Sequence, residues 1–304
     1  MKIKILVVSF IFIAFVSCNK KESRLGGAAN VALNLKSLGA KAILCAAIGD
    51  DSTGETFLEL MQNDKLESTC IIKDKGRKTT SKTRVISGSQ QLLRVDDESN
   101  HKLEETIEKE LTAKIFHSLE KDQINAIIFQ DYDKGIITPS LIENVVRKAQ
   151  DLHIPTLVDP KKRNFEHYKG VSLFKPNFKE FAEGLKIELK TGDINSISTA
   201  GNKFLENTSN SLLLLTLSDK GVFISNGKRY SHIPAHVRDI TDVSGAGDTV
   251  ISLAALCLAA GCNPAEVAAL SNLAGGLVCE KVGVVPIEKE HYMKECLSLE
   301  IPIW

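Results

Sequence analysis

The chain has 304 residues with 38 Lys and Arg against 38 Asp and Glu, and this balance excludes a protein whose main contacts are nucleic-acid phosphates. Its hydrophobic content of 43% and charged content of 25% are those of an ordinary globular protein, so disordered and fibrous classes are excluded as well. The seven cysteines include no C-x-x-C pair and several stand in apolar runs, as Cys45 and Cys257 do, so we expect reduced thiols and no zinc module.

The first residues of the chain differ from the rest. Two lysines precede an apolar run over residues 5–16, which ends in Ser17-Cys18. This order is typical of a secretory signal peptide, and Ser17-Cys18 resembles the lipid-attachment site of bacterial lipoproteins. A buried first strand over residues 3–8 is the alternative, because short apolar runs fit both interpretations.

We therefore divide the chain into a signal-like segment, residues 1–24, and one body, residues 25–304. Within the body, hydrophobic spacing predicts helices over residues 28–38 and 53–63, a strand over 42–48 and a hairpin over 79–95. Beyond residue 101, helical patterns alternate with four short apolar segments, at 126–129, 156–158, 171–174 and 211–217. Such alternation indicates an α/β fold with a mostly parallel sheet flanked by helices.

Polar side chains follow each of these four apolar segments. They are Asp131, then Asp159-Pro160-Lys161, then Lys175-Pro176-Asn177, and last Ser218-Asp219-Lys220-Gly221. Ligands of open parallel sheets bind beyond the carboxyl ends of the strands. The sequence therefore predicts a binding site formed by these four turns.

The feature with the clearest chemistry is Asp242-Val-Ser-Gly-Ala-Gly-Asp248, which leads into an apolar helix over residues 250–260. Backbone N–H groups of Gly245, Ala246 and Gly247 at a helix start would form an anion site. A carboxylate beside such a site suits proton abstraction from a hydroxyl that attacks a phosphoryl group. The alternative is a glycine-rich turn in which Asp248 only caps the helix.

Other phosphoryl-transfer and dinucleotide motifs are absent from the sequence. There is no G-x-x-x-x-G-K-[ST] loop, no H-R-D and D-F-G pair, and no G-x-G-x-x-G. A P-loop enzyme, a protein-type kinase and a dinucleotide enzyme are therefore disfavoured.

The Asp242–Asp248 segment resembles the C-terminal signature of the ribokinase-like (PfkB) carbohydrate kinases, and Gly26-Gly-Ala-Ala-Asn30-Val-Ala resembles their N-terminal signature. The strings Gln90-Gln-Leu-Leu-Arg94-Val-Asp96, Asp131-Tyr-x-Lys134-Gly, Asp159-Pro-Lys161 and Lys175-Pro-Asn177-x-x-Glu180 resemble those of the bacterial D-glycero-β-D-manno-heptose-7-phosphate kinases. The resemblance implies a ribokinase-like fold with a small β lid.

Site residues follow from the resemblance only where positions match. Asp248 would be the general base, with the backbone of Gly245, Ala246 and Gly247 stabilising the transferred phosphoryl. ATP would contact Ser218, Gly221 and Asn272, and Asn177 with Glu180 would place Mg²⁺ through water. A capping box is the alternative for that last pair. Sugar and sugar phosphate would contact Gly27, Asn30, Arg94, Asp131, Lys134 and Lys161, the two lysines having a solvated surface role as the alternative.

The resemblance further implies ATP-dependent phosphorylation of the anomeric hydroxyl of heptose 7-phosphate in the cytoplasm, toward ADP-heptose and lipopolysaccharide. It is compatible with a monovalent cation behind the residue 242–248 loop and with a homodimer. With no room after residue 289 for a second catalytic domain, we expect the kinase step alone. Another sugar or nucleoside kinase is the alternative among enzymes.

The sequence departs from the family at its start. Family members begin with a strand that ends in Gly-Asp and with lid strands, whereas residues 1–24 here are signal-like. We therefore expect an incomplete lid and an incomplete sugar pocket. A truncated or membrane-tethered binding protein without catalysis, anchored through a lipidated Cys18, is the alternative from a different functional class.

Overall fold

The structure is a computed structural model that describes residues 22–87, 90–236, 238–299, 301 and 304. Residues 1–21 of the signal-like segment, with Cys18, lie outside this part of the chain. None of the helices formed by the described residues combines the length and the apolar character that a membrane span needs.

A six-stranded sheet forms the centre of the molecule, with the strand order β10-β9-β8-β7-β6-β5. Strands β5 to β8 run parallel, and β9 and β10 are antiparallel to their neighbours. The strands are Ile127–Gln130 (β5), Thr156–Asp159 (β6), Leu173–Phe174 (β7), Leu212–Thr216 (β8), Val222–Ser225 (β9) and Tyr230–Ile233 (β10). The predicted α/β fold with a mostly parallel sheet is confirmed.

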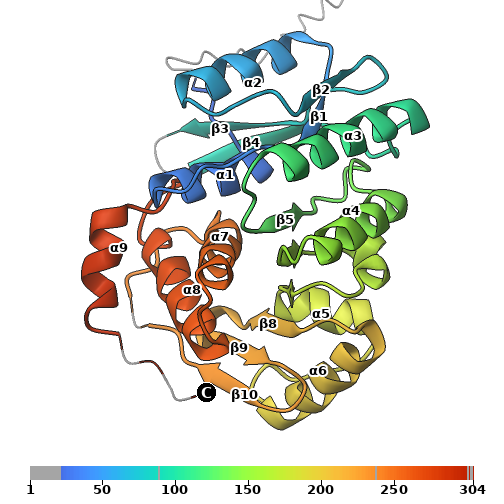
Figure 1. Cartoon of the computed structure of the whole chain (residues 1–304). Coiled ribbons are helices and arrows are strands. Elements are labelled where there is room, and N and C mark those ends of the chain that lie inside the picture. The colour runs from blue at the N-terminus through green and yellow to red at the C-terminus, as the bar shows by residue number, and fades with distance from the viewer. Residues whose placement is uncertain (1–21, 88–89, 237, 300, 302–303) are drawn as a thin grey trace, which may run out of the picture.

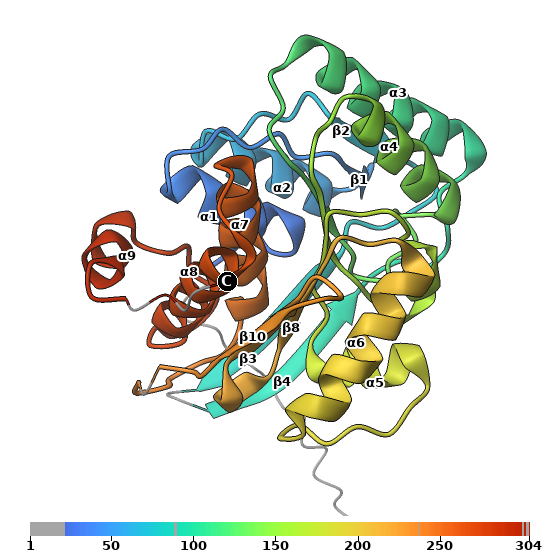
Figure 2. The ribbon, with the colours of Figure 1, turned by 60° about the horizontal axis from the view of Figure 1, so that its bottom comes forward.

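Helices cover both faces of this sheet (Figures 1 and 2). Helices α1, α7 and α8 pack on one face, with α9 against α8, and helices α3 to α6 lie on the other. The helices are Ala28–Ser37 (α1), Ser52–Asn63 (α2), Glu105–Lys121 (α3), Pro139–Asp151 (α4), Phe178–Leu185 (α5), Ile194–Thr208 (α6), Ala246–Ala259 (α7), Pro264–Val278 (α8) and Lys289–Cys296 (α9). Short 3-10 turns span Lys162–His167 (η1) and Ser218–Lys220 (η2).

Strand β8 shows why the central strands read as continuous apolar runs. Leu213 and Leu215 belong to the core on the side of α4 and α6, whereas Leu212 and Leu214 pack toward α7. Successive side chains of a strand point to opposite faces, so a strand covered on both faces needs apolar residues at every position.

Two smaller strand pairs lie beside the main sheet, near α2 (Figure 1). Strands Ala46–Gly49 (β1) and Ile71–Asp74 (β2) are parallel, and Ser81–Ser87 (β3) with Gln90–Asp97 (β4) form an antiparallel hairpin. The predicted hairpin is confirmed. The strand expected over residues 42–48 is shorter than predicted, because before Ala46 only Ile43 pairs, through an isolated bridge to Glu67.

Helix α7 begins at Ala246, four residues before the predicted start at 250. Its N-cap is Gly245, whose φ of 84° lies in the left-handed region that glycine adopts without strain. Gly247 and Asp248 therefore belong to the first helical turn.

Candidate active site

The carboxyl ends of β5, β6 and β7 meet the first turn of α7. Gln130 ends β5, and its amide nitrogen Nε2 lies 3.2 Å from Asp159 Oδ2 and 3.1 Å from Asp248 Oδ1. The ends of β5 and β6, which are distant in sequence, are thereby joined to the helix start. These contacts bring two of the four predicted polar turns together at the start of α7, and a binding site formed by all four stays a prediction.

The Asp248 carboxylate is buried and held by three donors. Asn30 Nδ2 donates to Oδ2 over 2.7 Å, and the Tyr132 hydroxyl donates to Oδ1 over 2.8 Å, beside the bond from Gln130. Burial raises the pKa of Asp248, while the bonds from Asn30 and Tyr132 lower it. A carboxylate whose proton affinity is increased in this way is a better proton acceptor.

The first turn of α7 also offers an anion site. The amides of Gly247 and Asp248 have no hydrogen-bond acceptor within the described residues, whereas Ala246 N donates to Val243 O. Unpaired amides and the helix dipole together attract negative charge at this end of α7. The loop before the helix is fixed by Asp242, whose carboxylate accepts from the amides of Ser244 and Gly283 at 2.9 Å each.

A buried ion pair lies beneath this turn. Lys175 Nζ is 3.0 Å from Asp159 Oδ2, and both side chains are almost fully buried. A Cβ added to Gly247 would lie 3.6 Å from Lys175 Nζ and 3.7 Å from Asp159 Oδ2. The negative charge of Asp159 raises the pKa of Asp248, whereas the positive charge of Lys175 lowers it. The pair therefore sets part of the field in which Asp248 titrates.

Asp131 is buried and its carboxylate is occupied by protein groups. It accepts hydrogen bonds from Asn164 Nδ2 at 2.9 Å, from the Tyr168 hydroxyl at 2.9 Å and from the amide of Asp133 at 2.7 Å. These bonds fix the loop that carries Tyr132 and Lys134. Contact between Asp131 and a sugar stays a prediction.

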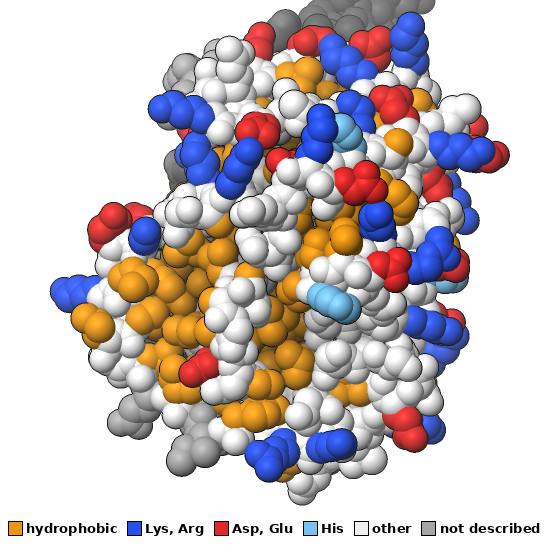
Figure 3. All heavy atoms as spheres, in the orientation of Figure 1, with side chains coloured by type: hydrophobic (Ala, Val, Ile, Leu, Met, Phe, Trp, Pro, Cys, Tyr) orange, Lys and Arg blue, Asp and Glu red, His pale blue; other side chains and the backbone are white. Residues whose placement is uncertain are grey.

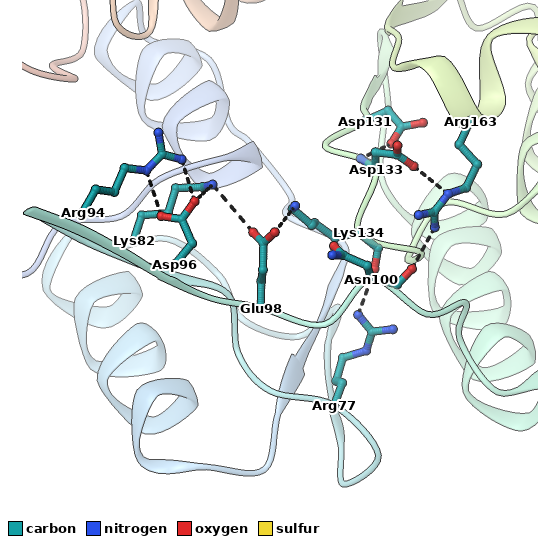
Figure 4. A network of polar contacts seen from close by, with 10 residues as sticks. All are labelled: Arg77, Lys82, Arg94, Asp96, Glu98, Asn100, Asp131, Asp133, Lys134 and Arg163. Atoms are coloured by element: carbon teal, nitrogen blue, oxygen red, sulfur yellow. Dashed lines mark hydrogen bonds and ion pairs between the residues drawn. The ribbon is translucent and has the colours of Figure 1, made fainter.

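Arg94 and Lys134 are joined by a row of ion pairs that runs from hairpin β3–β4 to the Asp131 loop (Figure 4). Arg94 pairs with Asp96, Lys82 lies between Asp96 and Glu98, and Lys134 pairs with Glu98. Three cations thus face two carboxylates along this row. One positive charge is left over, which suits an anionic ligand.

Asn177 and Glu180 form a capping box at the start of α5. Asn177 Oδ1 accepts from the Glu180 amide at 2.8 Å, and Glu180 Oε2 accepts from the Asn177 amide at 2.9 Å. Glu180 Oε1 also pairs with Lys161. The capping alternative is therefore correct, and the metal role stays a prediction. An amide oxygen and a carboxylate are hard donors, and this set fits Mg²⁺ that keeps its own waters.

The predicted nucleotide contacts lie in the turn that follows β8 and on α8. Ser218 begins η2. Gly221 follows η2 with a φ of 85°, and a Cβ added to it would lie only 2.0 Å from Ile233 O, so this position requires glycine. Asn272 on α8 donates to Pro234 O over 2.8 Å. Gly27 caps α1, with a φ of 60°, beside the ring of Tyr132. Each of these positions has a structural role, and the predicted ligand contacts remain predictions.

The model of the family described as "pfkB family carbohydrate kinase" matches residues 15–290, which is most of the chain. The chain belongs to the pfkB family of carbohydrate kinases. The resemblance seen in the two signatures is thereby confirmed, and the chain is a carbohydrate kinase.

Curated relatives of this kinase carry the name "Bifunctional protein HldE". The protein from Geobacter sulfurreducens is 35% identical over 269 residues, which are 88% of this chain and 54% of the relative. The protein from Campylobacter jejuni subsp. doylei is 38% identical over 268 residues, covering 88% of this chain and 55% of the relative. The kinase chain therefore spans about half the length of the curated relatives it matches.

Solved structures with the same fold have lower sequence identity. Phosphofructokinase-2 from Escherichia coli, in complex with potassium, superposes with a TM-score of 0.75 at 19% identity and covers 90% of this chain and 87% of that one. Ribokinase from Thermotoga maritima superposes with a TM-score of 0.64 at 20% identity, and the match covers 88% of this chain and 86% of that one. These similarities confirm the ribokinase-like fold.

Three side chains at the centre of this candidate site were given no role from the sequence, although Lys175 was named among the polar strand exits. Gln130 and Tyr132 contact Asp248, and Lys175 pairs with Asp159. Each stands at a strand exit, which is the signal that could have found them. Tyr132 and Lys175 also occur in the strings that carry the family resemblance.

Proposed function

We propose that this kinase transfers the γ-phosphoryl group of ATP to the anomeric hydroxyl of D-glycero-β-D-manno-heptose 7-phosphate, in the cytoplasm, on the route to ADP-heptose and lipopolysaccharide. The observation that carries the proposal is the buried Asp248 carboxylate next to two helix amides that have no acceptor among the described residues. The choice of heptose rests on the four sequence strings and on the similarity to proteins named HldE.

Asp248 would accept the proton of the anomeric hydroxyl as its oxygen attacks the γ-phosphorus. The bond from phosphorus to the bridging oxygen then breaks, and ADP leaves with the bonding electrons. Of the predicted amides, those of Gly245 and Gly247, together with that of Asp248, would donate to the equatorial oxygens, where negative charge is spread in the transition state. The Ala246 amide, also predicted, already donates to Val243 O. Ser218, Gly221 and Asn272 would line the nucleotide site.

Magnesium would be positioned through water by Asn177 and Glu180. When bound, it neutralises charge on the ATP phosphates. Lys161 pairs with Glu180 in the free protein, next to this proposed metal position, and would contact the sugar phosphate. A monovalent cation behind the residue 242–248 loop belongs to the same proposal.

The substrate phosphate would be held by the row of charges that includes Arg94 and Lys134. An anionic ligand would take over the cations that Asp96 and Glu98 neutralise in the free protein. Gly27 and Asn30 would face the sugar ring, because Asn30 adjoins the base directly. This substrate choice separates the proposal from a kinase that acts on an unphosphorylated sugar or nucleoside.

A homodimer is the proposed assembly. Ile86, Leu92, Leu93 and Val95 of hairpin β3–β4 are each at least half exposed, which is unusual for large apolar side chains so close in sequence. Light scattering would give a mass of two chains if this hairpin pairs.

The experiment measures ADP release from Mg-ATP by the full chain, with heptose 7-phosphate, free heptose or fructose 6-phosphate as acceptor. We expect turnover with heptose 7-phosphate, lost in Asp248→Asn and retained in Asp151→Asn, an exposed position at the end of α4. Preference for another acceptor would reject the heptose assignment. Absence of ADP with every acceptor, from a protein folded by circular dichroism, would favour a non-catalytic binding protein.

A further inference from the structure

Two cysteines lie opposite each other where the strand pair β1–β2 begins. Ala46 of β1 is paired with Ile71 of β2 in a parallel register, and Cys45 and Cys70 directly precede this pair. Ala46 N donates to Cys70 O over 3.3 Å, which brings the two backbones together at this point. Opposite residues of neighbouring strands are separated by about 4.8 Å. This separation lies within the range of about 4.4–6.8 Å between the Cα atoms of a disulfide.

Both cysteine side chains point to the same face of the strand pair, toward α3. Side chains alternate along a strand, so Cys45 shares its face with Ala47, and Cys70 shares its face with Ile72. Ala47 and Ile72 belong to the hydrophobic core on that side, against which Cys45 also packs. Cys70 Sγ lies 3.4 Å from the Ser118 hydroxyl of α3. The Cys45 thiol donates a hydrogen bond to the Cys70 sulfur, so the two free thiols are in contact.

The surroundings of Cys70 favour its thiolate. The hydrogen bond from Cys45 lowers the pKa of the Cys70 thiol to about 5, against the effect of burial, and Ser118 adds a second hydrogen bond that lowers it. Because the thiolate is the nucleophile, Cys70 is the reactive member of the pair. Cys45 is partly exposed and, like Ser118, lines a large groove that residues 127–130 also line. This groove gives a small molecule a route to the pair.

Three other cysteines of the described chain lack these surroundings. Cys257 and Cys296 belong to α7 and α9, and Cys279 directly follows α8. On the face drawn in Figure 3, hydrophobic side chains gather over α7 and α8. Burial raises the pKa of all three thiols, so they stay protonated and are poor nucleophiles.

We propose that Cys45 and Cys70 are a redox-sensitive pair that hydrogen peroxide oxidises to a disulfide within one chain. The Cys70 thiolate attacks one peroxide oxygen, the O–O bond breaks, and the leaving hydroxide takes up a proton to form water. The Cys45 sulfur then attacks the sulfur of the Cys70 sulfenic acid. The S–O bond breaks, and hydroxide leaves with the Cys45 proton as a second water. The two thiols thus lose two electrons, and one peroxide is reduced to two waters.

The disulfide would fasten the strand that supports the Asp131 loop. Strand β2 ends at Asp74, whose Oδ2 lies 3.2 Å from Arg77 Nε, and both side chains are almost fully buried. Arg77 Nη1 donates to Lys134 O over 3.4 Å. Oxidation at the start of β2 would therefore restrict the segment from which this loop is held. The test below measures thiols alone, so its outcome is independent of the proposed reaction.

Peptide mapping without reductant tests the proposal on the folded full chain, after exposure to hydrogen peroxide. Trypsin cleavage at lysines places Cys45 and Cys70 in separate peptides, residues 42–65 and 66–73. We expect these two peptides to be joined, and the intact mass to fall by about 2 Da for the two hydrogens lost. Dithiothreitol should separate the peptides again. In urea the joining should be slower by roughly tenfold or more, because the fold creates the contact and the reactive thiolate.

Cys45→Ser and Cys262→Ser form a matched pair of variants. Cys262 is also partly exposed and also contacts a second cysteine, Cys257. In Cys45→Ser we expect no joined peptides and a Cys70 sulfenic acid, about 16 Da heavier, that dimedone traps. Cys262→Ser should behave as the unchanged chain.

Three outcomes would overturn the proposed pair. The first is that peptides 42–65 and 66–73 stay separate under peroxide that oxidises Cys257 or Cys262. The second is equal joining in the folded chain and in urea, which would show that the fold contributes nothing. The third is joining between two chains, seen as a doubled mass without reductant, which would reject a disulfide within one chain.

Discussion

The side-chain amide of Asn30 and the carboxylate of Asp248 lie 2.7 Å apart, although 218 residues separate them in the sequence. Asn30 belongs to α1 and Asp248 to α7, and the two helices pack against each other through this contact. Asn34, one turn later on α1, accepts from the Thr249 hydroxyl at 3.2 Å. The two family signatures thus meet at Asp248, the proposed general base, and the bond from α1 lowers the pKa of this carboxyl.

Replacing Asn30 is expected to shift the pH dependence of the kinase. The Asn30 bond lowers the pKa of Asp248, so Asn30→Ala raises that pKa further above its ordinary value. A general base acts when deprotonated, so the acidic limb of kcat/KM moves to higher pH, by roughly one unit for a hydrogen bond to a charged group. Asn63→Ala, at the exposed end of α2, is the control. An unmoved acidic limb would contradict the assigned role.

Tyr132→Phe is expected to act in the same direction but less strongly. The variant removes the donor to Asp248 Oδ1, yet Gln130 Nε2 still donates to that oxygen at 3.1 Å. Asn30, in contrast, is the one described side chain that donates to Oδ2. The acidic limb of the pH profile should therefore move by less than about one unit. Tyr230→Phe on β10 should leave it unchanged, and a larger shift for Tyr132→Phe than for Asn30→Ala would reverse this ranking.

Gly245 and Gly261 offer a matched pair for the loop before α7. Both have φ near 80°, so alanine costs each about 1–2 kcal/mol in backbone strain. A Cβ at Gly245 would lie 3.2 Å from Val284 Cγ1 and 3.3 Å from Asn30 Nδ2, whereas nothing lies within 4 Å at Gly261. Urea unfolding should show similar losses of stability, with kcat/KM reduced only in Gly245→Ala. Equal kcat/KM for both variants would show that the loop tolerates the displacement of Asn30.

Much of the fold could be predicted from local sequence. The run Leu212–Leu215 indicated a strand buried on both faces, and the alternation after residue 101 indicated a parallel sheet. These signals are local because side-chain periodicity depends only on the strand and on the layers that cover it. The start of α7 was misplaced by four residues, since glycines at 245 and 247 read as a turn although only Gly245 leaves the helix.

The site could be predicted only as a set of separate turns. The strand exits pointed to Asp159 and Lys175, and the helix start pointed to Asp248, without showing that Lys175 pairs with Asp159 beneath Gly247. The pairing depends on strand order, which is a tertiary property. Sequence spacing did not predict the role of Tyr132 either. A tyrosine after a strand is common, and only the fold shows that its hydroxyl contacts the buried Asp248 carboxylate.

Lys134 is the most direct test of the substrate class. It pairs with Glu98 at the end of the charged row in Figure 4, and both side chains are partly buried, so a phosphate there would gain a charge-assisted hydrogen bond. Lys134→Ala is expected to raise KM for heptose 7-phosphate by roughly tenfold or more, because the variant loses one hydrogen bond to a charged group. KM for free heptose should change less than about twofold, because no phosphate is present to lose the contact.

Lys78→Ala is the matched control for this variant. Lys78 pairs with Asp97 at the end of β4 and is well exposed, so its loss should leave KM for both acceptors unchanged. The double variant Lys134→Ala with Glu98→Ala separates phosphate binding by Lys134 from the effect of leaving the Glu98 carboxylate without its cation. If KM recovers in the double variant, the lysine acts only by neutralising Glu98. If it stays high for heptose 7-phosphate alone, Lys134 contacts the phosphate directly, and equal losses for both acceptors would reject that contact.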